Sequence, residues 1–131
     1  MMIDQLESRV LFSSVPPIGS LHPVNLHASR GYITGHIPVL HATWNAPKIT
    51  AAERAVYGAP IGFQVATMKQ DNTGYVYQGL VPIGKGKTSF ATSITGLTPH
   101  TPMRVLVDTL FVGSATAGNV SVWSEVDITT I

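Results

Sequence analysis

The fold is decided by one stretch of the sequence, residues 93–107, which read SITGLTPHTPMRVLV. Apolar residues alternate with other residues on both sides of Gly96 and Pro99, as they do at Met103, Val105 and Val107. A period of two is typical of a strand that buries one face, and Gly and Pro interrupt strands at turns. The stretch therefore predicts two β-strands joined by a tight corner.

The same alternation recurs along the chain at the short intervals expected of a β-sandwich. Five further strands are predicted, around residues 24–28, 40–44, 63–67, 75–81 and 122–130. In the last of them, Val126 and Ile128 are predicted to point inward, and Glu125 and Asp127 outward. Seven strands in about a hundred residues is the number found in an immunoglobulin-like sandwich.

Five motifs in this order make the chain from Leu21 onward resemble a fibronectin type III domain. They are PVNL at 23–26, ATWNAP at 42–47, FQV at 63–65, the corner at 93–107 and WSEVDITT at 123–130. The resemblance implies an all-β fold, a seven-stranded fibronectin type III-like β-sandwich over residues 21–131, with Trp44 as its core tryptophan. It also implies a corner tyrosine, where this chain has Met103. We therefore expect Leu97 and Met103 to hold the corner by packing alone.

An insertion at residues 48–60 separates the second predicted strand from the third. Thr50 and Glu53 form a capping box, and Gly58 followed by Pro60 supplies a stop. The sequence thus predicts one short helix, Ala51–Tyr57, between strands two and three.

In such a sandwich the helix shares one pole with the turn at 84–87 and the segment at 111–119. Three loops at one pole form a candidate contact surface. Its binding residues would be Tyr57, Lys85, Lys87 and Phe111. The alternative is that the helix only plugs the open end of the sandwich.

The first 20 residues form an N-terminal arm ahead of the sandwich. Its apolar residues, which are candidates for assembly contacts, are Val10, Leu11, Phe12, Val15 and Ile18. They can pair with a sheet edge, although Pro16 and Pro17 limit the length of the pairing. Two alternatives stay open: the arm folds back on its own sandwich, or it adds a strand to a neighbouring subunit.

Composition excludes several classes of partner. The formal net charge is +1, from 8 basic and 7 acidic residues, so no basic field is available to hold nucleic acid. The chain has no cysteine, and no stretch is long and apolar enough to insert into a membrane. Residues 6–13, LESRVLFS, resemble a short leader motif of large bacterial surface proteins, which implies an extracellular or cell-surface location.

The sequence contains no pattern that predicts an enzyme, a cofactor or a metal. The segment 84–88, GKGKT, lacks the first glycine of a phosphate-binding loop, because Val81 stands there. No Gly-x-Ser-x-Gly elbow is present. Pairs of histidines five residues apart within a strand would point to opposite faces. An aromatic platform for sugar stays open as an alternative to core packing, with Tyr32, Tyr75, Tyr77 and Trp123 as its candidates.

Two functions therefore remain. The preferred one is a non-catalytic structural subunit of an extracellular filament or surface assembly, a homo-oligomer or homopolymer. Only 11% of the residues are charged, and outward positions such as Leu106 and Leu110 would be covered by a neighbour. The alternative is a monomeric module of a secreted enzyme or virion surface, which binds another surface protein or a polysaccharide.

Overall fold

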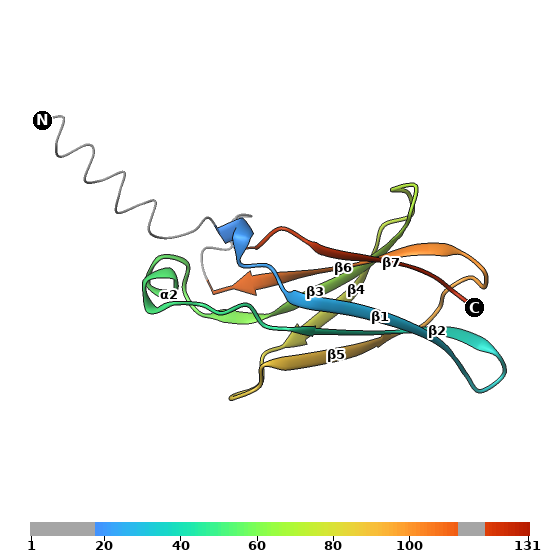
Figure 1. The fold of residues 1–131 in the computed structure, drawn as a ribbon, viewed down its shortest axis with the longest axis horizontal. Coiled ribbons are helices and arrows are strands. Elements are labelled where there is room, and N and C mark those ends of the chain that lie inside the picture. The colour runs from blue at the N-terminus through green and yellow to red at the C-terminus, as the bar shows by residue number, and fades with distance from the viewer. Residues whose placement is uncertain (1–17, 113–119) are drawn as a thin grey trace, which may run out of the picture.

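The computed structural model describes residues 18–112 and 120–131, which form two antiparallel sheets packed face to face (Figure 1). The first sheet has the order β1-β2-β5, with β1 at Val24–Ile33, β2 at Ile37–Asn45 and β5 at Ser89–Ile94. The second has the order β4-β3-β6-β7, with β3 at Pro60–Lys69, β4 at Val76–Pro82, β6 at Pro102–Phe111 and β7 at Ser124–Thr129. The predicted all-β sandwich is confirmed, strand by strand.

The core lies between the sheets and is built from the alternating apolar residues of both. Trp44 is 1% exposed, and its ring packs edge-on against Phe63 at a centroid distance of 5.6 Å. Phe90 stacks on the same indole at 6.4 Å. Val105 and Val107 from the corner stretch are fully buried. β2, β3, β5 and β6 therefore bury the face that their period of two predicts. β1 and β4 contain no fully buried residue.

The corner before β6 corrects one expectation, because packing does not hold it alone. Met103 is buried and Leu97 packs against the core, as expected. In addition, the Thr130 hydroxyl donates a hydrogen bond to Thr98 O at 2.6 Å and accepts one from Thr101 N at 2.9 Å. Thr130 is 1% exposed. A hydroxyl from the end of the chain thus bridges the corner, where the resemblance implies a tyrosine.

The inserted helix α2 spans Ala51–Tyr57, as predicted. The Thr50 side chain accepts from Glu53 N at 3.1 Å, and Glu53 Oε1 accepts from Thr50 N at 2.9 Å, so both halves of the capping box are present. Gly58 ends the helix at φ 82° and ψ −174°, backbone that only glycine adopts readily. A Cβ there would lie 2.3 Å from Val112 O, so Gly58 also lets α2 approach the end of β6.

One predicted outward residue is not available to a neighbour. Leu106 does point away from the core on β6, but it is only 4% exposed. β6 is an inner strand of its sheet, so β3 and β7 flank it on both sides. Leu110 is half-buried. The expectation that another subunit must cover Leu106 is therefore wrong. Within the described residues, no helix is long and apolar enough to cross a membrane.

Candidate functional site

The two sides of the sandwich differ in how they are closed. On one side β1 and β7 meet, and the Ser124 hydroxyl donates a hydrogen bond to Pro23 O. Further along the same side, Arg30 Nη1 donates to Thr129 O at 3.4 Å. We call this the closed side. Its two edge strands cover one another, so neither leaves a full edge free.

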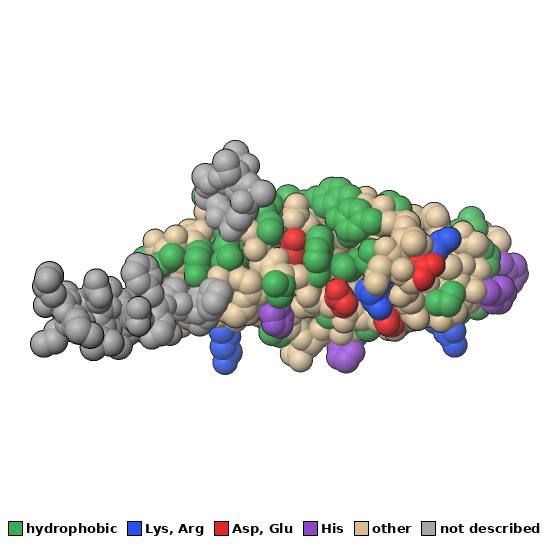
Figure 2. Space-filling model, turned by 90° about the horizontal axis from the view of Figure 1, so that it is seen from above, with side chains coloured by type: hydrophobic (Ala, Val, Ile, Leu, Met, Phe, Trp, Pro, Cys, Tyr) green, Lys and Arg blue, Asp and Glu red, His purple; other side chains and the backbone are tan. Residues whose placement is uncertain are grey.

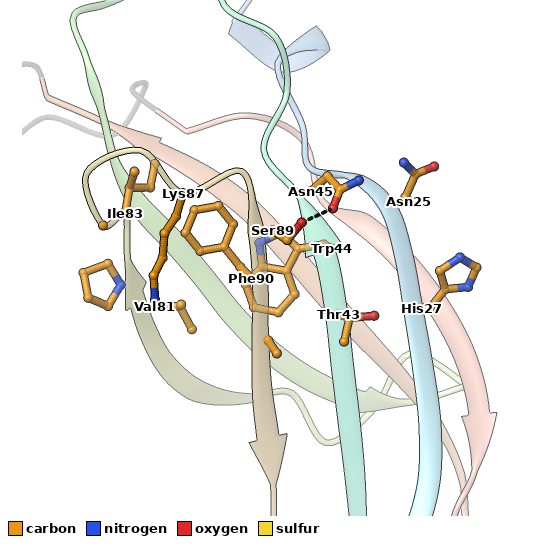
Figure 3. Close-up of a pocket in the computed structure, with 13 residues that line it drawn as sticks. Asn25, His27, Thr43, Trp44, Asn45, Val81, Ile83, Lys87, Ser89 and Phe90 are labelled. Carbon is orange, nitrogen blue, oxygen red and sulfur yellow. Dashed lines mark hydrogen bonds between the residues drawn. The ribbon is translucent and has the colours of Figure 1, made fainter.

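On the opposite side, β4 and β5 approach each other only where β4 ends and β5 begins (Figure 1). We call this the open side. A hollow of about 810 Å³ lies there. Figure 3 shows its lining on both sides of β5, with Val81, Ile83 and Lys87 toward β4 and Thr43 and His27 toward β1. Because the hollow reaches both faces of the strand, the free edge of β5 is accessible.

The floor of this hollow is the aromatic core. Trp44 and Phe90 line it from β2 and β5, and the Trp44 Nε1 has no hydrogen-bond partner among the described residues. Asn45 Oδ1 accepts a hydrogen bond from the Ser89 hydroxyl at 3.2 Å across the mouth (Figure 3). Among the described residues that line the hollow, Lys87 is the one cation. The lining is mostly neutral, which suits a protein edge or an uncharged ligand better than an anion.

Two segments of the predicted loop pole are described, and residues 113–119 of its third segment lie outside the described residues. Its four candidate residues divide into two groups. α2 and the turn at 83–88 lie at the same end of the sandwich (Figure 1). Tyr57 packs on Phe111 with centroids 6.3 Å apart, and Phe111 is 2% exposed. Phe111 is thus a core residue and not a contact residue, which corrects its predicted role. Lys85 and Lys87 are exposed on the turn, and Lys87 lines the hollow.

The arm lies mostly outside the described residues, and this is where Val10, Leu11, Phe12 and Val15 fall. Of the five arm residues, Ile18 is described, and it begins the short helix η1 (Ile18–Ser20). Gly19 O accepts a hydrogen bond from Val122 N at 3.3 Å. The sandwich therefore holds the chain from Ile18 onward, at the loop pole.

A second surface is the outer face of the four-stranded sheet. Hydrophobic side chains gather on it beside a few acidic and basic ones (Figure 2). Tyr75 and Tyr77 are each about half exposed, and the Tyr75 ring lies 6.4 Å from that of Trp123. Arg104 Nε donates to Asp127 Oδ1 at 2.8 Å, and the pKa of Asp127 is lowered by this hydrogen bond. The face thus offers exposed aromatic rings next to the ion pairs that Arg104 makes with Asp127 and Glu125.

Asp108 lies within this face and was not anticipated from the sequence. It is 2% exposed on β6, opposite Gln64 of β3. Burial raises the pKa of its carboxyl to about 7, although a hydrogen bond with the Gln64 backbone offsets part of the effect. The only sequence signal was an acidic residue at an outward position of a long apolar strand.

Two histidines, His27 and His41, are neighbours in the sheet, although their spacing along the chain does not reveal this. His27 pairs with Thr43, and Ser29 pairs with His41, so the two histidines are diagonal neighbours on the outer face of the three-stranded sheet. His41 Nδ1 hydrogen-bonds the Ser93 hydroxyl at 3.0 Å. In the part of the chain that the structure describes, no group of three or more His, Cys, Asp or Glu residues is placed to hold a metal ion.

No protein-family model matches the chain, and no curated protein is significantly similar to it. The architecture is a β-sandwich of two antiparallel sheets, which is consistent with the immunoglobulin-like class. Such sandwiches host many unrelated functions, so the function has to come from the surfaces described above.

Proposed function

We propose that this protein is a fibronectin type III-like, non-catalytic structural subunit of an extracellular or cell-surface assembly, and that copies of it associate through sheet edges and the N-terminal arm. The observation that carries the proposal is the open side of the sandwich. An edge strand presents unpaired N–H and C=O groups, which pair readily with another strand. The accessible edge of β5 is such a template.

The composition of the surface supports an assembly. Several large apolar side chains are more than a third exposed: Tyr32, Ile33, Ile37, Val56, Ile61, Tyr75, Val76, Tyr77, Leu80, Val112 and Val122. Only 11% of the residues are charged, against the usual quarter. Contacts between copies would remove these apolar side chains from water, at about 25 cal/mol per Å² buried.

The arm supplies the second part of the proposal. Seventeen residues precede Ile18, where η1 begins at the loop pole. Fully extended, they can span about 55 Å, whereas the ten residues of β1 span about 33 Å. The arm can therefore reach a neighbouring copy, and its apolar residues 10–12 and 15 suit contact with the exposed apolar side chains of that copy.

The test compares the full chain with a chain that lacks residues 1–17. The deletion keeps η1 and the Gly19–Val122 hydrogen bond, so the sandwich should fold with unchanged circular dichroism. Light scattering and negative-stain microscopy should then show large assemblies for the full chain and only small species for the deletion. If both chains form the same assemblies, the arm has no part in the function.

A second candidate function is favoured by Tyr75, Tyr77 and Trp123 on the outer face. Exposed rings can stack on the apolar faces of sugars, so a monomeric polysaccharide-binding module is the alternative. Tyr75→Ala and Tyr77→Ala should abolish retention on a polysaccharide array if this alternative holds. If the protein is instead a structural subunit, both variants should behave on the array in the same way as the parent chain, whichever sugar is present.

A further inference from the structure

Three of the four sheet edges carry features that hinder pairing with another chain. β1 and β7 cover each other on the closed side. β4 ends in Pro82 and contains a bulge next to Gly79, and both features interrupt an edge. β5 carries no such feature: Ser89–Ile94 reads SFATSI, with no proline, no charge and no register shift against β2. β5 is thus the unprotected edge.

The pairing of β5 with β2 identifies the groups that β5 leaves free. Ala46 N–H donates to Thr88 O at 2.9 Å, and hydrogen-bonded pairs recur at every second residue of an antiparallel ladder. Residues 90, 92 and 94 therefore bond toward β2. Ser89, Ala91 and Ser93 direct their N–H and C=O groups away from the sheet, and all three are exposed.

We propose that β5 pairs antiparallel with β5 of a second copy, about a two-fold axis at Ala91, so that two three-stranded sheets become one of six strands. This inference rests on the proposed function and names its partner surface. In this register Ser89 of each copy faces Ser93 of the other, and Ala91 faces Ala91. The free N–H and C=O groups of each copy then meet complementary partial charges on the other, in three hydrogen-bonded residue pairs.

The side chains of β5 fit this register. On the outer face the two-fold axis brings together only serine and alanine, which leave room for close approach. On the inner face each Phe90 lies opposite Thr92 of the other copy, a pairing of an aromatic with a β-branched residue that stabilises sheets. Phe90 is 7% exposed at the edge of its own core, so a second copy would extend that core.

The distribution of charged residues near β5 also permits this pairing. No Asp, Glu, Lys or Arg occurs between Thr88 and Met103. Across the axis Lys87 falls opposite Thr95, because partners in this register sum to 182, so the basic turn of one copy faces a neutral segment of the other. Like charges opposed across an antiparallel pair destabilise it, and here there are none. A second copy is therefore matched to this edge in backbone, shape and charge.

Cysteine crosslinking tests the register, since the chain has no cysteine of its own. In the proposed pair the two Ala91 Cα atoms lie about 5.5 Å apart, within the range of a disulfide. Ala91→Cys should thus give a covalent dimer on mild oxidation. Ser93→Cys is the matched control: its two copies lie about 14 Å apart, out of reach. A disulfide at Ser93→Cys with none at Ala91→Cys would overturn the register.

A charge on the edge tests the pairing itself. Ala91→Lys places two ammonium groups against each other across the axis and should reduce the mass of the assembled species at least twofold. Ser29→Lys adds the same charge to the same face of the sheet on β1, far from the axis, and should leave the mass unchanged. Both sites are exposed, so both variants should fold.

The outcomes separate this inference from the proposed function. If the parent chain assembles, and Ala91→Lys assembles equally while Ala91→Cys gives no dimer, the β5 pairing is wrong but the subunit proposal stands. If the parent chain stays monomeric at every concentration, the proposed function fails, and the β5 pairing fails with it.

Discussion

The side chain of Thr130 helps to hold the corner before β6. Its buried hydroxyl donates a hydrogen bond to Thr98 O and accepts one from Thr101 N, and both hydrogen bonds are partly buried. Thr130→Val keeps the shape but leaves both groups unpaired, and an unsatisfied buried group costs about 1–3 kcal/mol. We expect the free energy of unfolding to fall by about 2–3 kcal/mol, measured by urea denaturation. Thr129→Val, one residue earlier and less buried, should cost less than about 1 kcal/mol. Equal costs would contradict the role given to Thr130.

Asp108 predicts an unusual dependence of stability on pH. Its pKa is raised to about 7 in the folded chain, mainly by burial, against an ordinary value of 3.8. Between these values the folded state binds more protons than the unfolded state, so the free energy of unfolding falls as pH rises from about 4 to 7. A shift of this size corresponds to about 4 kcal/mol in the free energy of unfolding.

The substitution Asp108→Asn removes this titration. The difference in the free energy of unfolding between the variant and the parent should therefore grow in favour of the variant as the pH rises. We expect it to grow by about 2–4 kcal/mol from pH 4 to pH 8, measured by urea denaturation across that range. Asp127→Asn is the control with the opposite sign, because Arg104 lowers the pKa of Asp127 and its contribution is lost as pH falls. A parent and an Asp108→Asn variant that respond alike to pH would refute the assignment.

Among the elements, α2 depends on its final glycine. Gly58→Ala would need a backbone conformation that other residues avoid, and its Cβ would meet Val112 O. We expect a loss of about 3 kcal/mol or more in the free energy of unfolding. Gly35→Ala, in the β1–β2 turn, is the matched control: its φ is +87°, but a Cβ would meet nothing within 4 Å. It should cost about 1 kcal/mol. Similar losses for the two variants would mean that the approach of α2 to β6 is not constrained at Gly58.

The strands and the helix could be predicted because each is encoded locally. The period of two marked all seven strands, and the capping box at Thr50 and Glu53 fixed the start of α2. Contacts between distant residues could not be predicted in this way. Thr130 and the corner are about thirty residues apart in sequence, and a hydrogen bond between them leaves no periodic signal. The burial of Leu106 and Phe111 likewise depends on neighbouring strands and α2, and not on the pattern within β6.

The candidate surfaces could be predicted only in part, for the same reason. Strand order decides which edges are free, and strand order is a property of the folded chain. Once β5 is known to be an edge, the sequence becomes informative: six residues without charge or proline mark it as unprotected. The arm residues 10–12 and 15 remain a prediction from their apolar character.

For the whole molecule, the closed and open sides differ in how much free backbone they offer to another copy. The closed side offers little backbone for pairing, whereas we propose β5 on the open side and the arm as two separate contact surfaces. A two-fold contact at β5 makes closed dimers, and an arm that reaches a different copy would link dimers into a chain. Assemblies larger than a dimer should therefore need the arm, and the dimer should survive its deletion. Sedimentation of the chain without residues 1–17 measures this directly.

The most direct measurement is the mass of the purified full chain in solution, by light scattering over a wide range of protein concentration. The subunit account predicts species far above the 14.0 kDa of a single chain, whose mass increases with concentration. A constant mass of one chain at every concentration would contradict it.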